Sequence, residues 1–581
     1  MTQELAPLSP AIASELSLAL SALASTPREM GLPYDAWLQD QREMVEWAVR
    51  SDKRFVILNA GLGRGKSLVA VALALVLQGK RVAILTTTKA LEDQYAREFA
   101  DAGLVIMKGR NEFTCNLEPP LTADVAPCVD GFKCPLKPEG SCDYFRQKAV
   151  TTAARIYITN MAYFMSVYNY SDGLGPVDVL VVDEADLSEG WLLWMAGIKI
   201  TYATFKRVLP DVPVPRTKNV GVWMEWAERW YKTAALVHSR LEADMKEASN
   251  DGREANVPRQ LRNRYRQAGA VLNVLTQLRK IQDASKWVVE GVDQAEHSED
   301  QRTSVELKPI WAGEFGEPLL WRYGKEKVVL MSGTIPNPAR FTKLVGILDG
   351  QWEYREYGCV FPVENRPFYY IPTVKVHHNM SASDLDALVS RVDHIIGQRL
   401  DRKGIIHTGS YWMAQEVYGR SMWGGQEGIM VQHRPGKVED ALEGYLKADI
   451  PRVLVSPALG RGISLSGSAC SYIIHIRVPW PSMETEQMKA RMKEDKTYAA
   501  LVAAVSVEQG AFRAIRSPTD VAENFILDEV WRWFRVAYRD FFSEGFRTSW
   551  KKSALLPKPI ELPIELPMVA HTNQKEEEGD S

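Results

Sequence analysis

The sequence lacks a long apolar run and an excess of charge of either sign. No stretch reaches the roughly 18 apolar residues that a membrane span needs, and the N-terminus has no cationic segment followed by an apolar core. We therefore expect a cytoplasmic protein without membrane contact. The 70 basic and 73 acidic residues leave a formal net charge of −3, so any nucleic-acid path must be basic locally.

Cysteine is also scarce, and its distribution is uneven. Four of the six cysteines fall within one short stretch, at Cys115, Cys128, Cys134 and Cys142. In a reducing compartment such a group favours metal ligation over disulfide bonds. The spacing C-x12-C-x5-C-x7-C leaves zinc and an iron–sulphur cluster open, although structural zinc sites commonly use C-x2-4-C pairs, which are absent from this stretch.

The length indicates several domains. At 581 residues the chain is too long for one hydrophobic core. Apolar residues make up 46% and charged residues 25%, which is typical of globular proteins and leaves room for several packed cores.

A glycine-rich segment predicts a phosphate-binding loop. The apolar run 55–58 reads as a strand, AGLGRGKS follows at 60–67, and the apolar run 68–77 reads as a buried helix. Its glycines would let backbone N–H groups close around phosphate oxygens at the helix N-terminus. A glycine-rich turn that merely precedes a helix is the alternative, and the flanking strand and helix favour the loop.

Within this loop, two side chains carry the expected chemistry. Lys66 would reach the β- and γ-phosphates of ATP, and the Ser67 hydroxyl would ligate Mg²⁺. Alanine replaces the usual first glycine. The expected nucleotide-binding residues are Ala60, Gly61, Leu62, Gly63, Arg64, Gly65, Lys66 and Ser67.

Two carboxylates follow a second apolar strand, 177–182. In parallel sheets, ligands gather at the carboxyl ends of the strands. Asp183 would hold Mg²⁺, and Glu184 would orient or activate the attacking water. Alone, this acidic cluster would fit a helix cap equally well. Together with the loop it predicts ATP hydrolysis.

The order of these motifs resembles superfamily 2 helicases, and its details resemble their DinG/XPD branch, from about Gln41 to Arg547. The segment ILTTTKALEDQ, 84–94, looks like motif Ia, and VVLMSGTIPNP, 328–338, looks like motif III. The resemblance implies that Gln41 reads the adenine edge. It also implies that three threonines lie near the nucleic-acid backbone: Thr86, Thr87 and Thr88.

Two later segments bear on the coupling between ATP hydrolysis and movement along nucleic acid. QGAFRAIR, 509–516, resembles motif VI, which implies a catalytic role for Gln509 and arginine fingers at Arg513 and Arg516, although the spacing alone also fits an exposed helix face. The segment 456–467 stands where motif V is expected, but Arg461 and Ser464 replace acidic residues. This departure keeps an alternative open, an ATP-dependent nucleic-acid clamp or remodeller that does not separate strands.

Two inserts are expected in the first motor domain. The borders of the cysteine group, 109–115 and 142–164, resemble the iron–sulphur domain of this branch, which implies that the four cysteines hold one [4Fe–4S] cluster, with zinc as the competing metal. Residues 190–305 read as helical, with few strand signals, and resemble the arch domain. There Arg259, Arg262 and Arg266 share a helix face that would track phosphates, or else form a solvated face paired with nearby acids.

A second parallel-sheet domain is expected from strands near 404–407, 453–456 and 472–476 and a helix at 383–400. His407 would contact the nucleic-acid phosphates, although a lone histidine is more often structural. We predict the following bounds: an N-terminal extension (1–25), the first motor domain in three parts (26–108, 147–189 and 306–345), an iron–sulphur insert (109–146), a helical arch insert (190–305), the second motor domain (346–552) and a disordered tail (553–581).

The sequence therefore predicts an α/β protein with two RecA-like parallel-sheet motor domains and two inserts. It predicts an ATP- and Mg²⁺-dependent DNA helicase that translocates on single-stranded DNA. The branch resemblance implies 5′→3′ movement, unwinding of tailed or forked duplexes, and action as a monomer.

Overall fold

The computed structural model describes residues 17–61, 63–130, 134–249, 258–292, 304–424, 429–435, 438–448, 452–457, 465, 467–517, 519–552 and 555–562. The chain divides into two compact units. The first comprises Met1–Cys359, Trp480–Val505 and Asp540–Glu544, and the second comprises Val360–Pro479, Ser506–Arg539 and Gly545–Ser581.

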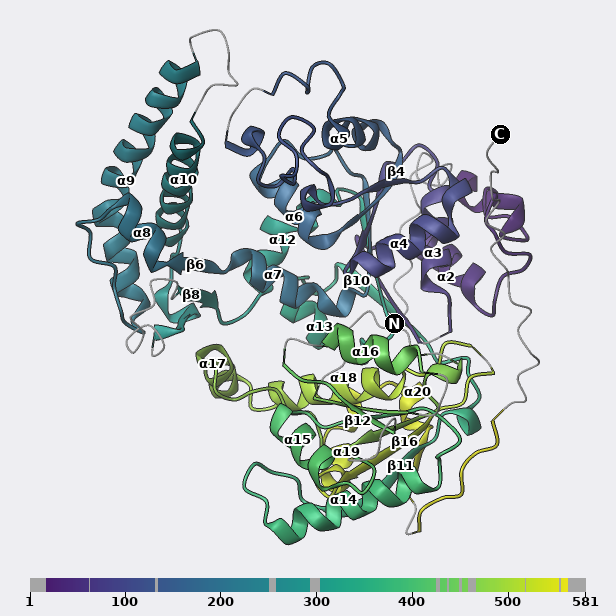
Figure 1. The fold of residues 1–581 in the computed structure, drawn as a ribbon. Coiled ribbons are helices and arrows are strands. Elements are labelled where there is room, and N and C mark those ends of the chain that lie inside the picture. Colours follow the sequence, from purple (N-terminus) through teal and green to yellow (C-terminus); the bar gives the residue numbers. More distant parts are fainter. Residues whose placement is uncertain are drawn as a thin grey trace, which may run out of the picture. The chain divides into compact units, whose positions relative to one another are not determined.

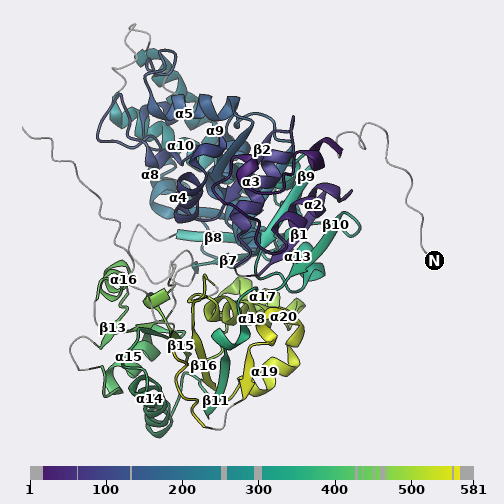
Figure 2. The same cartoon turned by 90° about the vertical axis from the view of Figure 1, so that its right-hand side faces the viewer.

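A seven-stranded parallel sheet forms the centre of the first unit (Figures 1 and 2), in the order β10-β1-β9-β5-β2-β4-β3. Every residue of β1 is buried, because helices cover both faces of the sheet. The strands are β1 Phe55–Ala60, β2 Val82–Thr86, β3 Val105–Met107, β4 Ile156–Asn160, β5 Val179–Asp183, β9 Lys327–Ser332 and β10 Trp352–Tyr357. The helices that join them are α2 Gln41–Arg50, α3 Lys66–Val76, α4 Lys89–Glu98, α5 Asp143–Ala153, α6 Met161–Tyr170, α7 Ser188–Ala196, α12 Gly316–Leu319 and α13 Pro338–Val345.

Successive side chains of β1 point to opposite faces of the sheet, so they are divided between two cores. Val56 and Leu58 pack in the core that contains most of α3, whereas Phe55 and Ile57 pack in the core on the opposite face. The two cores hold the sheet between layers of helices, so its strand ends are fixed platforms for the loops that follow them.

The helical insert carries a long hairpin of helices, α9 Val220–Ser249 and α10 Arg259–Arg279, which lie side by side in Figure 1. It also contains α8 Tyr202–Val208 and a three-stranded antiparallel sheet, which corrects the expectation of a helical segment with few strands. Its strands are β6 Ile198–Thr201, β7 Trp287–Glu290 and β8 Ser304–Pro309. These strands are short, and β6 pairs with β8 across the whole insert, so their pairing joins segments that are remote in sequence.

The first unit extends beyond its expected end at 345. Strand β10 pairs in parallel with β1, from Phe55↔Trp352 to Ala60↔Tyr357. Helix α17 Glu486–Glu494 also belongs to this unit and packs on β7. The boundary expected between 345 and 346 is therefore too early, because β10 belongs to the first sheet and lies after it.

The second unit contains its own seven-stranded parallel sheet, in the order β13-β14-β12-β15-β16-β11-β17. Its strands are β11 Phe368–Val374, β12 Gly404–His407, β13 Met430–Gln432, β14 Val453–Ser456, β15 Tyr472–His475, β16 Glu523–Asp528 and β17 Trp550–Lys552. Its helices are α14 Ala382–Gly397, α15 Tyr411–Arg420, α16 Val438–Leu446, α19 Trp531–Ala537 and α20 Glu544–Arg547, while α18 Tyr498–Ala511 begins in the first unit and ends in the second. The two sheets confirm the predicted α/β class with two parallel-sheet domains.

Among the described residues, no helix combines the length and the apolar content that crossing a membrane requires.

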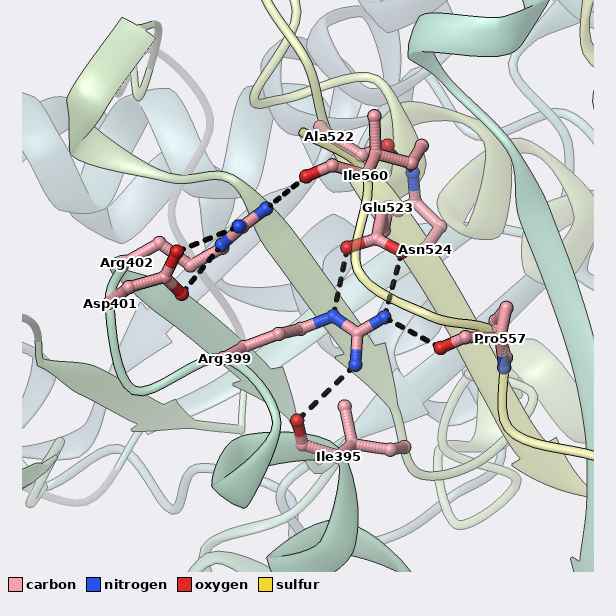
Figure 3. Close-up of polar contacts among 9 residues, drawn as sticks. All are labelled: Ile395, Arg399, Asp401, Arg402, Ala522, Glu523, Asn524, Pro557 and Ile560. Atoms are coloured by element: carbon pink, nitrogen blue, oxygen red, sulfur yellow. Dashed lines mark hydrogen bonds and ion pairs between the residues drawn. The ribbon is translucent and has the colours of Figure 1, made fainter. Parts of the chain in front are cut away.

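The C-terminal segment 555–562 lies against the second unit, contrary to the expectation that everything after 552 is disordered. Arg399 donates to the Pro557 carbonyl at 3.3 Å, and Arg402 donates to the Ile560 carbonyl at 2.7 Å (Figure 3). Leu556 packs against the core of the unit. Main-chain carbonyls are the acceptors, so the composition of the tail does not reveal this contact.

Truncation after Lys552 should therefore destabilise the second unit by roughly 1–3 kcal/mol, because two guanidinium groups lose a hydrogen-bond acceptor. Denaturant unfolding followed by far-ultraviolet circular dichroism would measure the loss. A matched truncation after Leu562 retains both carbonyls and should leave the transition in place. Equal transitions for the two truncated chains would contradict a stabilising role for 555–562.

Candidate functional site

The glycine-rich loop connects β1 to α3 at the carboxyl edge of the first sheet. Gly63 and Gly65 have φ values of +79° and +59°, a region in which a side chain would be strained. Gly61 packs closely on the end of β10, since an added Cβ would lie 2.8 Å from the backbone nitrogen of Cys359. Leu62 lies outside the described residues. The loop thus adopts the strand–loop–helix arrangement that its sequence predicts.

Lys66 is the first residue of α3, and its amine folds back across the loop. Its Nζ donates to the Ala60 carbonyl at 3.3 Å. A Cβ at Gly333, in the loop after β9, would lie 3.8 Å from this Nζ. The ammonium group is therefore held over the loop, at a helix N-terminus that favours phosphate.

Gln41 and Arg64 brace the loop from outside. Gln41 donates to the Arg64 carbonyl at 2.9 Å and accepts from the Leu38 backbone at 2.9 Å, so both ends of its amide are engaged. The Arg64 guanidinium pairs with Asp40 at 2.7 Å and donates to the Gly358 carbonyl at 2.8 Å. In this structure Gln41 holds the loop, and the adenine contact expected of it stays a prediction.

Asp183 ends β5 and is buried beside the loop. Burial raises the pKa of Asp183, and the nearby Lys66 ammonium opposes that rise. The Tyr95 hydroxyl, from α4, donates to Asp183 Oδ2 at 3.0 Å, and Tyr95 is also hydrogen-bonded to Ser67. Asp183, Ser67 and Lys66 thus meet at one point, where the first two could hold Mg²⁺ and the third a phosphate.

Glu184 follows in a left-handed backbone conformation, with φ +51°. Its backbone N–H donates to Asp183 Oδ1 at 2.9 Å, and its Oε2 accepts a hydrogen bond of 2.5 Å from the Thr87 hydroxyl. Such a conformation is uncommon for a residue with a side chain, and it directs the carboxylate away from the strand.

The segment that resembles motif III lies beside these carboxylates. Ser332, at the end of β9, donates to Asp186 Oδ1 at 2.7 Å, and Thr334 N donates to Ser332 Oγ at 3.1 Å. The register Asp183↔Met331 places the two strand ends next to each other. The motifs from three strands are thus gathered at one edge of the sheet.

The three threonines at the end of β2 differ in exposure. Thr86 is fully buried, Thr87 is buried against Glu184, and Thr88 caps α4 by accepting from Leu91 N at 3.2 Å. Of the three, only Thr88 has a partly exposed side chain. Their contact with nucleic acid stays a prediction. Thr88 and the backbone would make most of this contact.

The arginines that resemble motif VI lie in the second unit. Gln509 is on α18, and Arg513 and Arg516 follow its end. The backbone N–H of Arg516 donates to Asp520 at 2.6 Å. Phe512 replaces the usual glycine and is buried against Phe546, with ring centroids 5.5 Å apart. The arginines thus follow a packed helix end, and their catalytic role stays a prediction.

His407 ends β12 in the same unit. Its ring stacks on that of His475 with centroids 5.7 Å apart. Burial, together with smaller effects of the neighbouring His475 and Arg513, lowers the pKa of His407 to about 3. A neutral, buried ring favours the structural role over phosphate contact.

Two short turns belong to the cysteine insert: η3 Arg110–Glu112 precedes Cys115, and η4 Pro127–Asp130 contains Cys128. Burial raises the pKa of Cys128, the Arg110 guanidinium lowers it, and the other three thiols raise it again, so all four lie within electrostatic reach. Arg110 donates to Cys128 Sγ at 3.3 Å, and Glu118 N donates to Cys115 Sγ at 3.4 Å. Across the described ranges, no three histidine, cysteine or acidic side chains are close enough to hold a single metal ion.

The arginine face of α10 borders the cysteine insert. Arg262 forms a two-pronged ion pair with Glu118, at 3.1 and 3.4 Å, rather than with an acid of its own helix. A cavity of about 250 Å³ lies there, lined by Glu118, Leu121, Val125, Arg259, Arg262, Asn263 and Arg266. The three predicted arginines therefore share one polar cavity.

Comparison with known proteins identifies the architecture. Residues 397–549 match the model of the helicase C-terminal domain. Three solved structures align with 89% of this chain and 100% of theirs at 15% identity: an XPD helicase (TM-score 0.58), Xpd4 of S. tokodaii (0.55) and an apo form of XPD (0.54). The chain has the XPD helicase fold. No curated protein matches it.

Tyr95 contacts the site but was not predicted from the sequence. Arg64 was expected among the nucleotide-binding residues, and its guanidinium pairs with Asp40. Tyr95 lies four residues after Leu91 in α4, so helical spacing alone turns it towards the sheet, but its partner Asp183 is remote in sequence. The residues that depart from motif V, Arg461 and Ser464, lie outside the described residues.

Proposed function

We propose that this XPD-like helicase uses ATP and Mg²⁺ to translocate 5′→3′ along single-stranded DNA, as a monomer, and to unwind tailed or forked duplexes. The observation that carries the proposal is the meeting of Lys66, Ser67 and Asp183 at one edge of the sheet, with Glu184 beside them. These are the positive charge, the Mg²⁺ ligands and the water-orienting carboxylate that phosphoryl transfer requires.

In the proposed reaction, Lys66 neutralises charge on the β- and γ-phosphates, and Ser67 and Asp183 hold the metal. A water oxygen bonds to the γ-phosphorus while the bond to the ADP oxygen breaks, and Glu184 accepts the proton that the water loses. The motif VI resemblance supports catalytic roles for Gln509, Arg513 and Arg516, in which the arginines would supply further positive charge to the transferring group.

Cys115, Cys128, Cys134 and Cys142 would hold a [4Fe–4S] cluster, which would cross-link the insert. Two observations fit this donor set. A guanidinium and a backbone N–H are directed at Cys128 and Cys115, where they would stabilise thiolates. The other three thiols each raise the pKa of Cys128, so the four cysteines lie in one neighbourhood.

Anaerobically purified protein should therefore be brown, with a visible absorption band and about four irons per chain. Cys134→Ser should lower this absorbance and impair strand separation more than ATP hydrolysis, because Cys134 is not one of the residues gathered around Lys66. The matched variant Cys470→Ser removes a buried thiol of the second unit and should keep the band. A colourless protein with stoichiometric zinc would disprove the cluster.

The DNA path is proposed to run past the loop 86–88 and the arginine face of α10. Thr88 offers a partly exposed hydroxyl at a helix N-terminus, a position that favours phosphate. Arg259 and Arg266 line the polar cavity beside Glu118. Guanidinium groups bind phosphates strongly, and binding should weaken as the salt concentration rises.

The choice of nucleic acid and the direction of movement are tested together. ATP hydrolysis should rise on addition of single-stranded DNA. Duplexes with a 5′ tail should be separated and duplexes with a 3′ tail should not. Equal stimulation by single-stranded RNA would show that the protein acts on either nucleic acid. Preferential separation of the 3′-tailed duplex would reverse the proposed direction.

A further inference from the structure

The loop 86–88 is tied directly to the hydrolytic carboxylate. Strands β2 and β5 are neighbours in the parallel sheet, with Val82↔Val179 and Leu85↔Val182 in register. Their carboxyl ends therefore emerge side by side, and the loop after β2 lies beside the carboxylates after β5. The Thr87 hydroxyl spans this gap and donates to Glu184 Oε2 at 2.5 Å.

The burial of this hydrogen bond and the charge of its acceptor make it strong. Thr87 is only 8% exposed, so water cannot easily replace Glu184 as the acceptor of its proton. A hydroxyl that donates to a carboxylate forms a charge-assisted bond, shorter and stronger than a neutral one. The left-handed backbone of Glu184, with φ +51°, fixes the point from which its side chain extends. Together these features hold the carboxylate on Thr87.

This contact competes with catalysis. The oxygen of Glu184 that accepts from Thr87 is already occupied in this arrangement. The carboxylate is also directed at the loop after β2, where Thr87 lies. The resting arrangement of Glu184 is therefore unfavourable for hydrolysis.

A second hydroxyl group also connects this part of the chain to the ATP site. Tyr95 lies on α4, the helix that begins directly after Thr88, and its hydroxyl donates to Asp183 Oδ2 at 3.0 Å. Displacement of the loop 86–88 would also move the start of α4. Both acidic residues of the ATP site are thus connected to the same segment.

We propose that Thr87 is a positioning residue that restrains Glu184 until a nucleic-acid strand binds the loop 86–88. Strand binding moves Thr87, breaks its hydrogen bond and frees Glu184 for the attacking water. The inference rests on the proposed function, and it explains how strand binding would stimulate hydrolysis.

The test is ATP hydrolysis by Thr87→Val, which keeps the branched shape and removes the hydroxyl. Without nucleic acid its rate should rise about tenfold over wild type, the factor equivalent to about 1.4 kcal/mol, near the lower range for hydrogen bonds to charged groups. Its rate with saturating single-stranded DNA should stay near that of wild type, so stimulation should almost disappear. Thr87→Ser retains the donor and should restore both rates.

A matched variant separates this effect from loss of any buried hydroxyl. Thr159 lies on the neighbouring strand β4, is fully buried, and donates to the Met107 carbonyl at 2.7 Å. Thr159→Val should keep the wild-type stimulation. Thermal unfolding would show whether Thr87→Val is folded. If it is not, Thr87→Ala takes its place as the variant without the hydroxyl.

The outcomes distinguish this inference from the proposed function. Wild-type hydrolysis that no nucleic acid stimulates would refute strand-coupled hydrolysis itself. If wild type is stimulated, an unchanged basal rate in both Thr87→Val and Thr87→Ala would overturn the restraint alone. Fluorescence anisotropy with labelled DNA completes the test, since weaker binding with an unchanged basal rate would make Thr87 only a strand contact.

Discussion

Lys66→Ala is expected to lower ATP hydrolysis by at least about a hundredfold, the usual loss when one preorganised charge or donor is removed from a transition state. The ammonium is held over the loop by the Ala60 carbonyl, at the N-terminus of α3, and no neighbouring lysine of the loop can replace it. Steady-state phosphate release would measure the effect.

A control for this substitution lies outside the site. Burial raises the pKa of Asp183, and the Lys66 ammonium opposes that rise, so the substitution also removes a charge that favours the ionised carboxylate. The partly exposed Lys53 is a matched control, and Lys53→Ala should hydrolyse ATP normally. Substantial turnover by Lys66→Ala would overturn the assignment of the site.

Arg399→Met is expected to destabilise the second unit by about 3–5 kcal/mol, the cost of leaving one member of a buried ion pair without its partner. Arg399 and Glu523 are both fully buried, and two hydrogen bonds of 2.8 Å join them (Figure 3). Methionine fills much of the space but leaves the Glu523 carboxylate without its cation.

Denaturant unfolding, with hydrogen exchange followed in β16, would measure this loss. The double variant Arg399→Met with Glu523→Met should recover much of the stability, because no unpaired charge remains. Arg420→Met is the matched surface control. Arg420 pairs with Asp386 while 35% and 65% of the two side chains are exposed, so its loss should cost less than about 1 kcal/mol. A similar cost for both arginine variants would contradict the importance of burial.

Local patterns predicted the parallel strands well. Strands β12 and β14 have the expected bounds, 404–407 and 453–456, and α14 lies close to its expected range. Both strands are flanked by others in the sheet, so they are apolar up to their last residue and stand out in the sequence. The loop before Lys66 was equally clear, because its glycines and flanking apolar runs are all local.

Features that depend on distant partners were not predicted. Strand β6 finds its partner β8 about a hundred residues later, at Ile198↔Leu307. The segment 555–562 binds through carbonyls, which every residue possesses. The contacts of Tyr95 with Asp183 and of Thr87 with Glu184 join strand ends that become neighbours only in the folded sheet.

Strand separation driven by ATP is the measurement that tests the central claim most directly. A labelled duplex with a 5′ single-stranded DNA tail would be incubated with the holoprotein and ATP, with Lys66→Ala in parallel. The wild-type protein should release the labelled strand only when ATP and Mg²⁺ are present, and Lys66→Ala should release none. ATP hydrolysis that single-stranded DNA stimulates, without any strand release from either tail polarity, would contradict the helicase and favour an ATP-dependent clamp.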